Sequence, residues 1–245
     1  MADRCPEVSA ADLSDVPSAP PAVELRRVTK CYEDSGRSQV VLADLDMTVG
    51  AGEIVAVVGR SGSGKSTLLN LIGALDEPTT GEILIAGASL ARLDETARAL
   101  LRRQRIGFVF QFFNLIPTLT VGENLRLPLE LNGVEPGDAC DRAAQWLETV
   151  GLGDRSASFP ETLSGGEQQR LAVARALIHQ PALILADEPT GNLDAETAAQ
   201  LLELLETLGR QYGSTLLIAT HSNEAAARCD RVFSIGSGRL LEYPR

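Results

Sequence analysis

The segment IVAVVGRSGSGKSTLLNLI, residues 54–72, decides the fold, because three local patterns follow one another in it. Ile54 to Val58 is a short β-branched run, which is typical of a strand buried on both faces. Gly59 to Ser66 then fits G-x-x-x-x-G-K-[ST] without a mismatch. After it, apolar residues recur at helical spacing at Leu68, Leu71, Ile72 and Leu75. A strand, a glycine-rich turn and a helix are the context that this motif requires in order to bind phosphate.

The residue types of the turn explain how it could hold a nucleotide. Glycines let backbone N–H groups point inward as a nest, and the following helix adds the positive end of its dipole. Lys65 can reach the β and γ phosphates, and the Ser66 hydroxyl can bind Mg²⁺. A flexible Gly/Ser loop with a solvated lysine is the alternative, which the flanking strand and helix disfavour. We therefore predict a phosphate site at Gly59, Ser61, Gly62, Ser63, Gly64, Lys65 and Ser66.

Composition limits the classes of protein that the chain can belong to. Its 245 residues have room for one large α/β domain or for a domain with a subdomain. The net charge of −11 predicts no nucleic-acid partner, because a basic patch is needed to release counterions from phosphate. The four cysteines (Cys5, Cys31, Cys140 and Cys229) show neither metal-ligand spacing nor a pairing pattern, so we interpret them as reduced thiols.

The N-terminal region and the hydropathy pattern predict a cytosolic chain. Residues 1–22 are rich in Ala, Pro, Ser and Asp, and we expect a disordered tail there. They lack the basic start and the apolar core of a signal peptide. No apolar run reaches the length that spans a bilayer.

Strand patterns flank the phosphate motif on both sides. AVELRRVTK and VVLADLDMTV predict two strands around a polar turn at Glu33 to Ser38, and GEILIAGA (residues 81–88) predicts another. Tyr32 could be a half-buried hairpin side chain or could stack on adenine, and the pattern leaves both open. Asp94 can cap a short helix that carries Ala97, Leu100 and Leu101. A strand from Ile106 to Phe110 follows and ends at Gln111.

Residues 112–160 have a different character. The apolar positions Ala143, Trp146, Leu147 and Val150 fit a helix, and Gly151 stands where a glycine would end it. No strand pattern interrupts this segment. We therefore expect a helical subdomain inserted between two parts of an α/β core, residues 23–111 and 161–245.

The octapeptide LSGGEQQR, residues 163–170, opens a helix with Leu171, Ala174 and Ile178 facing inward. A capping box of Ser164 and Glu167 would explain those two residues. It would not explain Gly165 and Gly166, which weaken a helix start and which we expect to have no role inside one chain. Two glycines beside a capping serine suit the close approach of a second anion.

Acidic and basic groups follow two further buried strands. ALILA, residues 182–186, ends in Asp187 and Glu188, and such strand ends lie at the ligand crevice of an α/β sheet. Asp187 can hold Mg²⁺ and Glu188 can polarise the attacking water, although an acid pair can also merely cap the next helix. TLLIAT, residues 215–220, places His221 at the same edge, whereas His179 at a helix end is interpreted as structural. GNLD, residues 191–194, leads into a long helix with Leu201, Leu202, Leu205 and Leu208 apolar.

The motifs of this chain, taken in order, resemble the nucleotide-binding subunit of ATP-binding-cassette transporters. They are Gly59–Ser66, Gln111, LSGGEQQR, ALILADEP, GNLD and His221. The resemblance covers nearly the whole chain after Pro21, and LSGGEQQR is specific to that superfamily. The segments VFQFFNLIPTLTVGENLRLPLELNG and LADEPTGNLDAET are similar to the subgroup that serves lipoprotein release and macrolide export. The resemblance implies a P-loop NTPase core of the α/β class, with a mainly parallel sheet, an N-terminal antiparallel β-subdomain and an inserted α-helical subdomain.

The resemblance also implies a role for each matching residue. Tyr32 would stack on adenine, and residues 59–67, now including Thr67, would bind the phosphates of ATP and Mg²⁺. Gln111 and Asp187 would contact Mg²⁺, Glu188 would be the general base, and His221 would sense the γ-phosphate. The helix start formed by Ser164, Gly165, Gly166 and Glu167 would contact the ATP held by a second copy.

The resulting expectation is an ATPase that forms a homodimer over two ATP molecules and drives a transmembrane permease. The permease would dock near residues 112–116, where Phe112, Phe113, Leu115 and Ile116 follow Gln111, and would hold the cytoplasmic chain at the inner face of the membrane. A non-transport member acting in DNA repair or translation is the alternative, but the chain has neither a long heptad insertion nor two cassettes. LSGGEQQR disfavours a kinase, and no base-reading motif indicates a GTPase.

Overall fold

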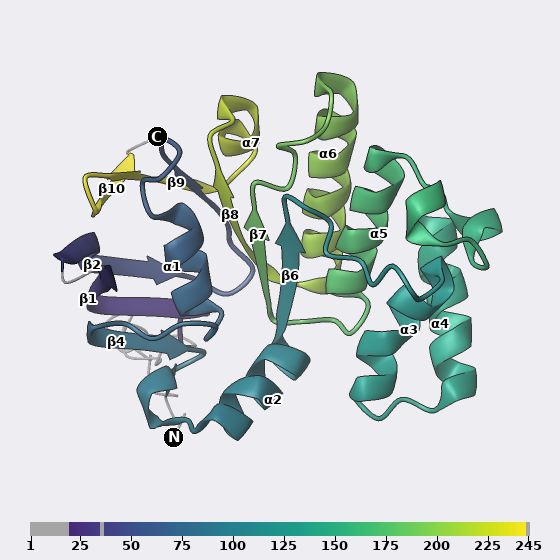
Figure 1. Ribbon diagram of the computed structural model, residues 1–245, viewed down its shortest axis with the longest axis horizontal. Helices are drawn as coiled ribbons and strands as arrows, with labels where there is room; N and C mark the ends of the chain where they lie inside the picture. The colour runs from purple at the N-terminus through teal and green to yellow at the C-terminus, as the bar shows by residue number, and fades with distance from the viewer. Residues whose placement is uncertain (1–19, 35–36, 244–245) are drawn as a thin grey trace, which may run out of the picture.

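The computed structural model describes residues 20–34 and 37–243 (Figure 1). The tail expected at residues 1–22 lies outside this range, apart from residues 20–22. The carbonyl oxygen of Ala22 accepts a hydrogen bond from Ala86 N at 3.0 Å, so the chain is tied to its first sheet just before the first strand. None of the described helices is long and apolar enough to cross a membrane.

Two sheets form the framework. The first is antiparallel, in the order β2-β1-β4-β5. The second has the order β10-β9-β3-β8-β7-β6, and its neighbours are parallel except for β10 beside β9. The strands are β1 (Val23–Asp34), β2 (Arg37–Val49), β3 (Ile54–Val58), β4 (Thr80–Ile85), β5 (Ala88–Ser89), β6 (Ile106–Phe110), β7 (Leu183–Asp187), β8 (Thr215–Thr220), β9 (Arg231–Gly236) and β10 (Arg239–Tyr243). The predicted antiparallel and mainly parallel sheets are both confirmed.

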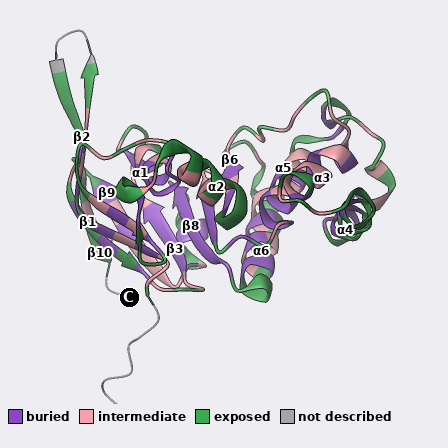
Figure 2. Ribbon diagram, turned by 90° about the horizontal axis from the view of Figure 1, so that it is seen from below, coloured by how far each residue is buried: buried purple, intermediate pink, exposed green. Residues whose placement is uncertain are grey.

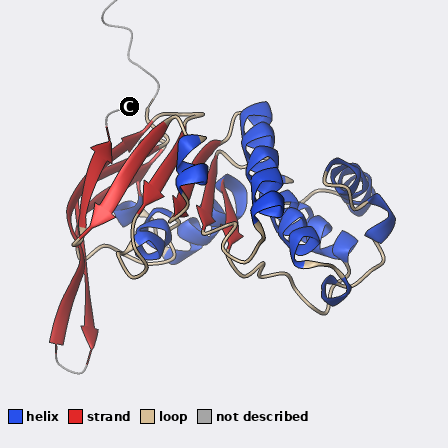
Figure 3. Ribbon diagram, turned by 90° about the horizontal axis from the view of Figure 1, so that it is seen from above, coloured by secondary structure: helices blue, strands red, loops and turns tan. Residues whose placement is uncertain are grey.

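Each face of the larger sheet belongs to a separate apolar core. Val55 and Val57 of β3 face a core shared with the antiparallel sheet and with α1 (Lys65–Ile72). Ile54 and Ala56 face the other core, together with α5 (Gly165–Leu177) and α6 (Ala195–Tyr212). This alternation is why a continuous β-branched run was needed at residues 54–58. Figure 1 shows α1 on the side of the antiparallel sheet and α5 and α6 on the opposite side of the larger sheet. In Figure 3 the strands gather toward one end of the molecule, and the other end consists of helices.

Residues 112–160 contain helices and no strand. They form α3 (Val121–Leu131) and α4 (Pro136–Thr149), followed by the short 3-10 turns Gly153–Arg155 and Pro160–Thr162. Both helices pack toward α5, and their apolar residues join the same core as α5 and α6. Gly151 ends this region of helix with a φ of 70°, as its predicted position requires. The remaining helices are α2 (Glu95–Arg105), capped by Asp94, the 3-10 turn Leu90–Arg92, and α7 (Asn223–Ala227).

Three local expectations were wrong. The strand expected over residues 81–88 is broken, because the chain turns through Ala86 and Gly87, both at positive φ, between β4 and β5. Leu75 does not continue the stripe of α1, because the helix ends at Ile72 and the chain turns through Gly73 and Ala74, which leaves Leu75 50% exposed. The polar turn expected at Glu33 to Ser38 is shorter, since β1 runs to Asp34 and β2 starts at Arg37. In Figure 2 these strand ends project from the body as an exposed two-stranded ribbon, in which polar side chains can be solvated on both faces.

Candidate functional site

A cleft of about 620 Å³ opens where the carboxyl ends of the parallel strands meet. Its lining includes nine of the predicted residues: Ser61, Gly62, Gly64, Lys65, Ser66, Thr67, Gln111, Glu188 and His221. Arg60, which lies within the expected range 59–67, and Val41 line it as well, and sequence reasoning missed Val41 in this role. Strands β3, β6, β7 and β8 therefore deliver the predicted groups to one edge of the sheet, as the rule for open α/β sheets requires.

The glycine-rich turn between β3 and α1 lines this cleft. Gly64 caps α1 with a φ of 103°, a conformation that suits glycine. A Cβ there would also lie 2.7 Å from Cδ2 of Leu42, so the β2 strand behind the loop leaves no room for a side chain. The Oγ atom of Ser63 is buried and has no partner among the described residues. The loop is thus a polar cradle that the surrounding backbone holds in shape.

Lys65, Glu188 and His221 form one connected group. Nζ of Lys65 lies 3.2 Å from Oε1 of Glu188, and it also donates to the carbonyl oxygens of Gly59 at 2.9 Å and Arg60 at 3.3 Å. Nδ1 of His221 lies 2.9 Å from the other carboxylate oxygen of Glu188. Three elements therefore aim one carboxylate, a lysine and an imidazole at the same volume.

The backbone of Glu188 is held in an unusual conformation. Its φ of 46° lies in the left-handed region, which non-glycine residues seldom adopt. The hydrogen bond from Glu188 N to Ala219 O at 2.8 Å and the one from Gly191 N to Glu188 O at 3.0 Å hold it there. Such a conformation at a strand end next to a polar cleft is a feature of functional sites.

Asp187 has the environment of a metal ligand. Its Oδ1 atom is buried and has no partner among the described residues. Burial, together with the nearby charge of Glu188, raises the pKa of Asp187 above its ordinary value, against an opposing hydrogen bond from Ser66 and the charge of Lys65. A partly buried carboxylate beside a serine hydroxyl is the oxygen donor set that suits Mg²⁺. The residues present therefore fit this ion.

Gln111 is fixed by a reciprocal pair of contacts with Asn192. Nδ2 of Asn192 donates to the carbonyl oxygen of Gln111 at 2.9 Å, and Nε2 of Gln111 donates to Oδ1 of Asn192 at 3.4 Å. The loop that leads into α6 thus positions the residue that follows β6. Asn192 belongs to GNLD, but no pattern in the sequence predicts this contact.

The LSGGEQQR helix start lies outside the cleft of its own chain, since Ser164, Gly165, Gly166 and Glu167 are absent from the lining. The predicted capping box is present: Oγ of Ser164 accepts from Glu167 N at 3.3 Å, and the Glu167 carboxylate accepts from Ser164 N at 2.8 Å. The hydrogen bonds from the Ser164 backbone and side chain lower the pKa of Glu167.

The two glycines of this helix start differ. A Cβ on Gly166 would lie 2.7 Å from Cγ2 of Thr197 in α6, whereas a Cβ on Gly165 would only meet Cζ of Phe113 at 3.8 Å. The expectation that neither glycine has a role inside one chain is therefore wrong for Gly166. It lets α5 approach α6 closely, which a pattern confined to one helix cannot reveal.

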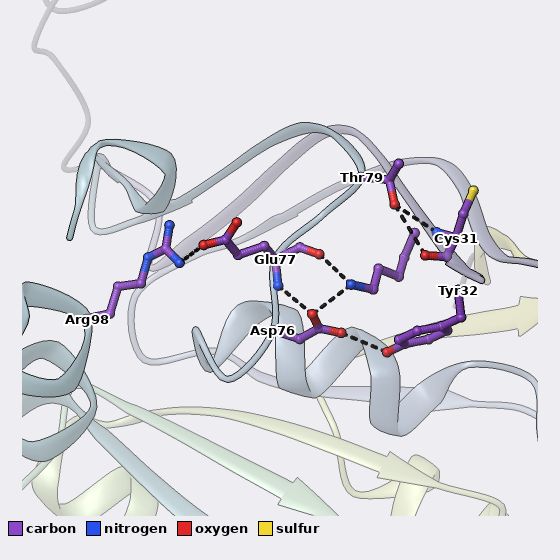
Figure 4. A network of polar contacts seen from close by, with 7 residues as sticks. Cys31, Tyr32, Asp76, Glu77, Thr79 and Arg98 are labelled. Atoms are coloured by element: carbon purple, nitrogen blue, oxygen red, sulfur yellow. Dashed lines mark hydrogen bonds and ion pairs between the residues drawn. The ribbon is translucent and has the colours of Figure 1, made fainter. Parts of the chain in front are cut away.

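Tyr32 is not among the residues that line the cleft, but it interacts with Thr67, which is one of them. The residue is 41% exposed, and its hydroxyl donates to Oδ2 of Asp76 at 2.8 Å (Figure 4). Burial and this hydrogen bond raise the pKa of Tyr32, while an interaction with Thr67 of the phosphate loop opposes the rise. The structure thus places Tyr32 beside the phosphate loop, and its stacking on adenine stays a prediction.

A buried glutamine of α5 links the ends of β6 and β7 beneath the cleft. Gln169 of α5 is fully buried, and its Nε2 donates to the carbonyl oxygens of Phe110 at 3.0 Å and Pro189 at 2.7 Å. These are the residues next to Gln111 and Glu188. Sequence reasoning missed the role of Gln169. The available signal was its position four residues before Val173, which places an amide on a helix face that is otherwise apolar. His179 shows no comparable contact with the site, and burial lowers its pKa, in keeping with a structural role.

A phosphate cradle with its lysine, beside a metal-type aspartate and a constrained glutamate, defines a nucleoside-triphosphate hydrolase of the P-loop class. Residues 42–191 match the family model described as ABC transporter, and the chain belongs to that family. It is an ATP-binding subunit of an ABC transporter and an ATPase.

Similar proteins support this assignment over most of the chain. The ABC transporter ATP-binding protein Rv0986 of Mycobacterium tuberculosis is 50% identical, with 90% of this chain and 89% of that protein covered. The lipoprotein-releasing system ATP-binding protein LolD of Pseudomonas syringae is 48% identical, with 89% and 96% covered. Among solved structures, the chain matches the ATP-binding cassette MJ0796 with a TM-score of 0.84 and 39% identity, covering 90% of this chain and 97% of that one. That structure shows MJ0796 in a dimeric post-hydrolysis state bound to ADP and Pi.

Proposed function

We propose that two copies of this chain close head to tail over two ATP molecules and drive a permease that extracts or exports a lipoprotein, lipid, peptide or drug-like substrate. The observation that carries the catalytic part is the Glu188 carboxylate, held between Lys65 and His221 at the end of β7. The substrate class follows from relatives that are named for lipoprotein release and for pyoverdine export. Binding to the permease would keep the chain at the inner face of the membrane.

The residues of the cleft have separate tasks in this proposal. The N–H groups of residues 59–67 and the Lys65 ammonium bind the phosphates and stabilise charge that develops on them. Ser66, Gln111 and the free Oδ1 of Asp187 would hold Mg²⁺, which neutralises the phosphate charge when bound. Glu188 accepts the proton of the attacking water, and His221 orients the Glu188 carboxylate and senses the γ-phosphate. Tyr32 stacks on the adenine with the exposed face of its ring.

Replacing the base tests the catalytic assignment. Glu188→Gln keeps the shape of the side chain but cannot take a proton, so turnover should fall by roughly two or more orders of magnitude while ATP still binds. Lys65→Ala should lose ATP binding as well, because the cradle loses its cation. Titration calorimetry with Mg-ATP and a phosphate-release assay on both variants distinguish these roles. Near wild-type hydrolysis by Glu188→Gln would show that another group is the base.

The head-to-tail dimer is supported by the position of the LSGGEQQR helix start. Among the described residues, Gly165 has no close neighbour that explains it, and the start of α5 does not line the cleft of its own chain. Both observations are explained by a dimer in which the start of α5 faces the ATP of the other copy. Glu188→Gln should therefore accumulate dimers with Mg-ATP, measurable by light scattering. A variant that stays monomeric at saturating nucleotide, alone and with its permease, would refute the shared site.

The loop after Gln111 is the proposed permease dock. Phe112 is 70% exposed, whereas Phe113 and Ile116 are partly buried and Leu115 packs against the core around α5. Arg175 of α5 holds this loop by donating to the carbonyl oxygens of Asn114 at 2.7 Å and Phe113 at 3.1 Å. The exposed aromatic on a fixed loop suits a contact with a short helix of the membrane subunit.

Phe112 is the residue to change in testing this dock, because substitutions at Leu115 would also disturb the core. Phe112→Ala should leave the Mg-ATP affinity of the isolated subunit unchanged and should weaken pull-down of the permease. Phe159→Ala, another exposed phenylalanine of the same region, is the matched control. Intact pull-down by Phe112→Ala would place the dock elsewhere.

A further inference from the structure

Two residues of β1 lie together on one face of the strand beside the phosphate loop. Lys30 and Tyr32 are two positions apart, so their side chains point to the same side. Nζ of Lys30 lies 4.8 Å from the centroid of the Tyr32 ring. Lys30 is only 9% exposed, whereas Tyr32 remains 41% exposed. The ammonium group is therefore covered beside a ring that stays accessible.

Asp76 connects these two side chains. Its Oδ2 accepts from the Tyr32 hydroxyl at 2.8 Å, and its Oδ1 accepts from Lys30 Nζ at 2.7 Å and from Glu77 N at 2.7 Å. Lys30 also donates to the carbonyl oxygen of Glu77 at 2.8 Å. Figure 4 shows Asp76 between the hydroxyl of Tyr32 and the ammonium group, so that the tip of the ring is fixed by a charged partner.

The loop that carries Asp76 is attached at both ends. At its start, the N–H groups of Leu75 and Asp76 donate to the carbonyl oxygen of Asn70, at 2.8 and 3.3 Å, near the end of α1. At its end, Oγ1 of Thr79 accepts from Cys31 N at 2.9 Å, next to Tyr32. Since α1 begins with Lys65, the loop fixes Tyr32 relative to the phosphate cradle through that one helix.

The ionisation states preserve this arrangement near neutral pH. Burial, followed by the hydrogen bond to Asp76, raises the pKa of Tyr32, so that its hydroxyl keeps the proton that it donates. Burial opposes ionisation of Asp76, but the hydrogen bonds from Lys30, Tyr32 and the Glu77 backbone outweigh it and lower the pKa of Asp76. The Asp76 carboxylate therefore keeps its hydrogen bonds from the Lys30 ammonium group and from the Tyr32 hydroxyl.

We propose that Lys30 and Asp76 are positioning residues of the nucleotide site, which hold the Tyr32 ring at a fixed distance from the phosphate loop for the base of ATP. This inference rests on the proposed stacking role of Tyr32. A ring that is fixed before binding avoids the entropy cost of ordering a side chain when the base arrives. Loss of Asp76 should therefore weaken ATP binding by roughly 3- to 10-fold, the range for one freed side chain, with kcat at saturating ATP preserved.

The experiment compares ATP with a ligand that lacks the base. Mg-ATP and Mg-tripolyphosphate are titrated into the wild-type chain and into Asp76→Ala, Asp76→Asn, Lys30→Met, Tyr32→Phe, Tyr32→Ala and the double variant Asp76→Ala/Tyr32→Ala. The first four variants should weaken ATP and leave tripolyphosphate unchanged. The double variant should bind ATP no more weakly than Tyr32→Ala alone, because Asp76 acts through the ring.

Asp46→Ala is the matched control, because Asp46 supports the same strand elsewhere, accepting a hydrogen bond from Arg27 N at 3.0 Å. It should leave the binding of both ligands unchanged. Equal losses for ATP and tripolyphosphate in Asp76→Ala would overturn the inference, since the loop would then support only the phosphate cradle. Additive losses in the double variant would overturn it as well. If Tyr32→Ala binds ATP as wild type does, the stacking role itself fails; if only the Asp76 and Lys30 variants are silent, stacking stands and the positioning role fails.

Discussion

Substituting the two glycines of the LSGGEQQR helix start by alanine should have different effects on stability. Gly166→Ala places a methyl group 2.7 Å from Cγ2 of Thr197, well inside the separation of about 3.5–4.0 Å that two carbon atoms prefer. Gly165→Ala places one 3.8 Å from Cζ of Phe113, an ordinary contact. The two variants differ in one packing contact and are otherwise closely matched.

The size of the difference follows from two competing terms. Alanine in place of a helical glycine gains up to about 1 kcal/mol of propensity, and somewhat less near a helix start. Overpacking typically costs about 1–3 kcal/mol. Gly165→Ala should therefore leave the free energy of unfolding unchanged or raise it slightly. Because the propensity gain is common to both, Gly166→Ala should be less stable than Gly165→Ala by about 1–3 kcal/mol.

Urea unfolding of both variants measures this difference, and Thr197→Ser tests its cause. The serine removes Cγ2 but keeps the hydroxyl, which donates to Oδ2 of Asp194 at 2.7 Å. Gly166→Ala/Thr197→Ser should regain the stability of Gly165→Ala. Equal urea midpoints for the two single variants, with no gain in stability from Thr197→Ser, would refute the packing role of Gly166. Both glycines would then be explained only by the proposed contact with the ATP of the second copy.

Three further outcomes are expected. Gln169→Leu removes the amide that donates to the carbonyl oxygens of Phe110 and Pro189, so it should destabilise the chain by about 1–3 kcal/mol and lower kcat more than ATP affinity. Gln168→Leu loses one contact to Leu163 O and should change kcat little, and an unchanged kcat in Gln169→Leu would exclude its link to Gln111 and Glu188. Asn124→Leu removes the amide that bonds Ile116, Leu119 and Thr120, so it should lower the melting temperature and weaken permease pull-down together. The pKa of Glu167 is lowered in the folded chain, so Glu167 contributes fully to stability above the ordinary glutamate pKa and loses this contribution as pH falls through its folded-state pKa. The difference in unfolding free energy between wild type and Glu167→Ala should therefore close on acidification, and a difference independent of pH would contradict this.

Local patterns predicted the elements that are buried on both faces. The strands at Ile54–Val58, Ile106–Phe110 and Thr215–Thr220 have the predicted bounds, because β-branched and apolar runs between polar neighbours mark such strands sharply. The capping residues Ser164 and Asp94 were predicted equally well, since a cap is a contact within four residues.

What the sequence could not show are contacts between distant segments and changes of backbone direction. Gly166 meets Thr197, and Gln169 meets Pro189, only after α5, α6 and β7 have packed together. Leu75 fits the helical stripe but lies beyond a turn in which Ala74 adopts a φ of 53°. The hairpin also runs further than its polar composition indicates, because paired strands on an exposed ribbon need no apolar face. The functional roles of Tyr32 and of residues 112–116 stay predictions.

The pairing of β3 sets the order in which the protein can become active during synthesis. β3 ends in the phosphate loop, yet both of its neighbours come from the end of the chain: Ile54 pairs with Leu216 of β8, and Val55 pairs with Arg231 of β9. A chain emerging from the ribosome exposes the phosphate motif early, but it lacks both flanking strands until almost all of the sequence has been made. Nucleotide binding is therefore among the last properties that a growing chain acquires, and an incomplete chain should not hydrolyse ATP.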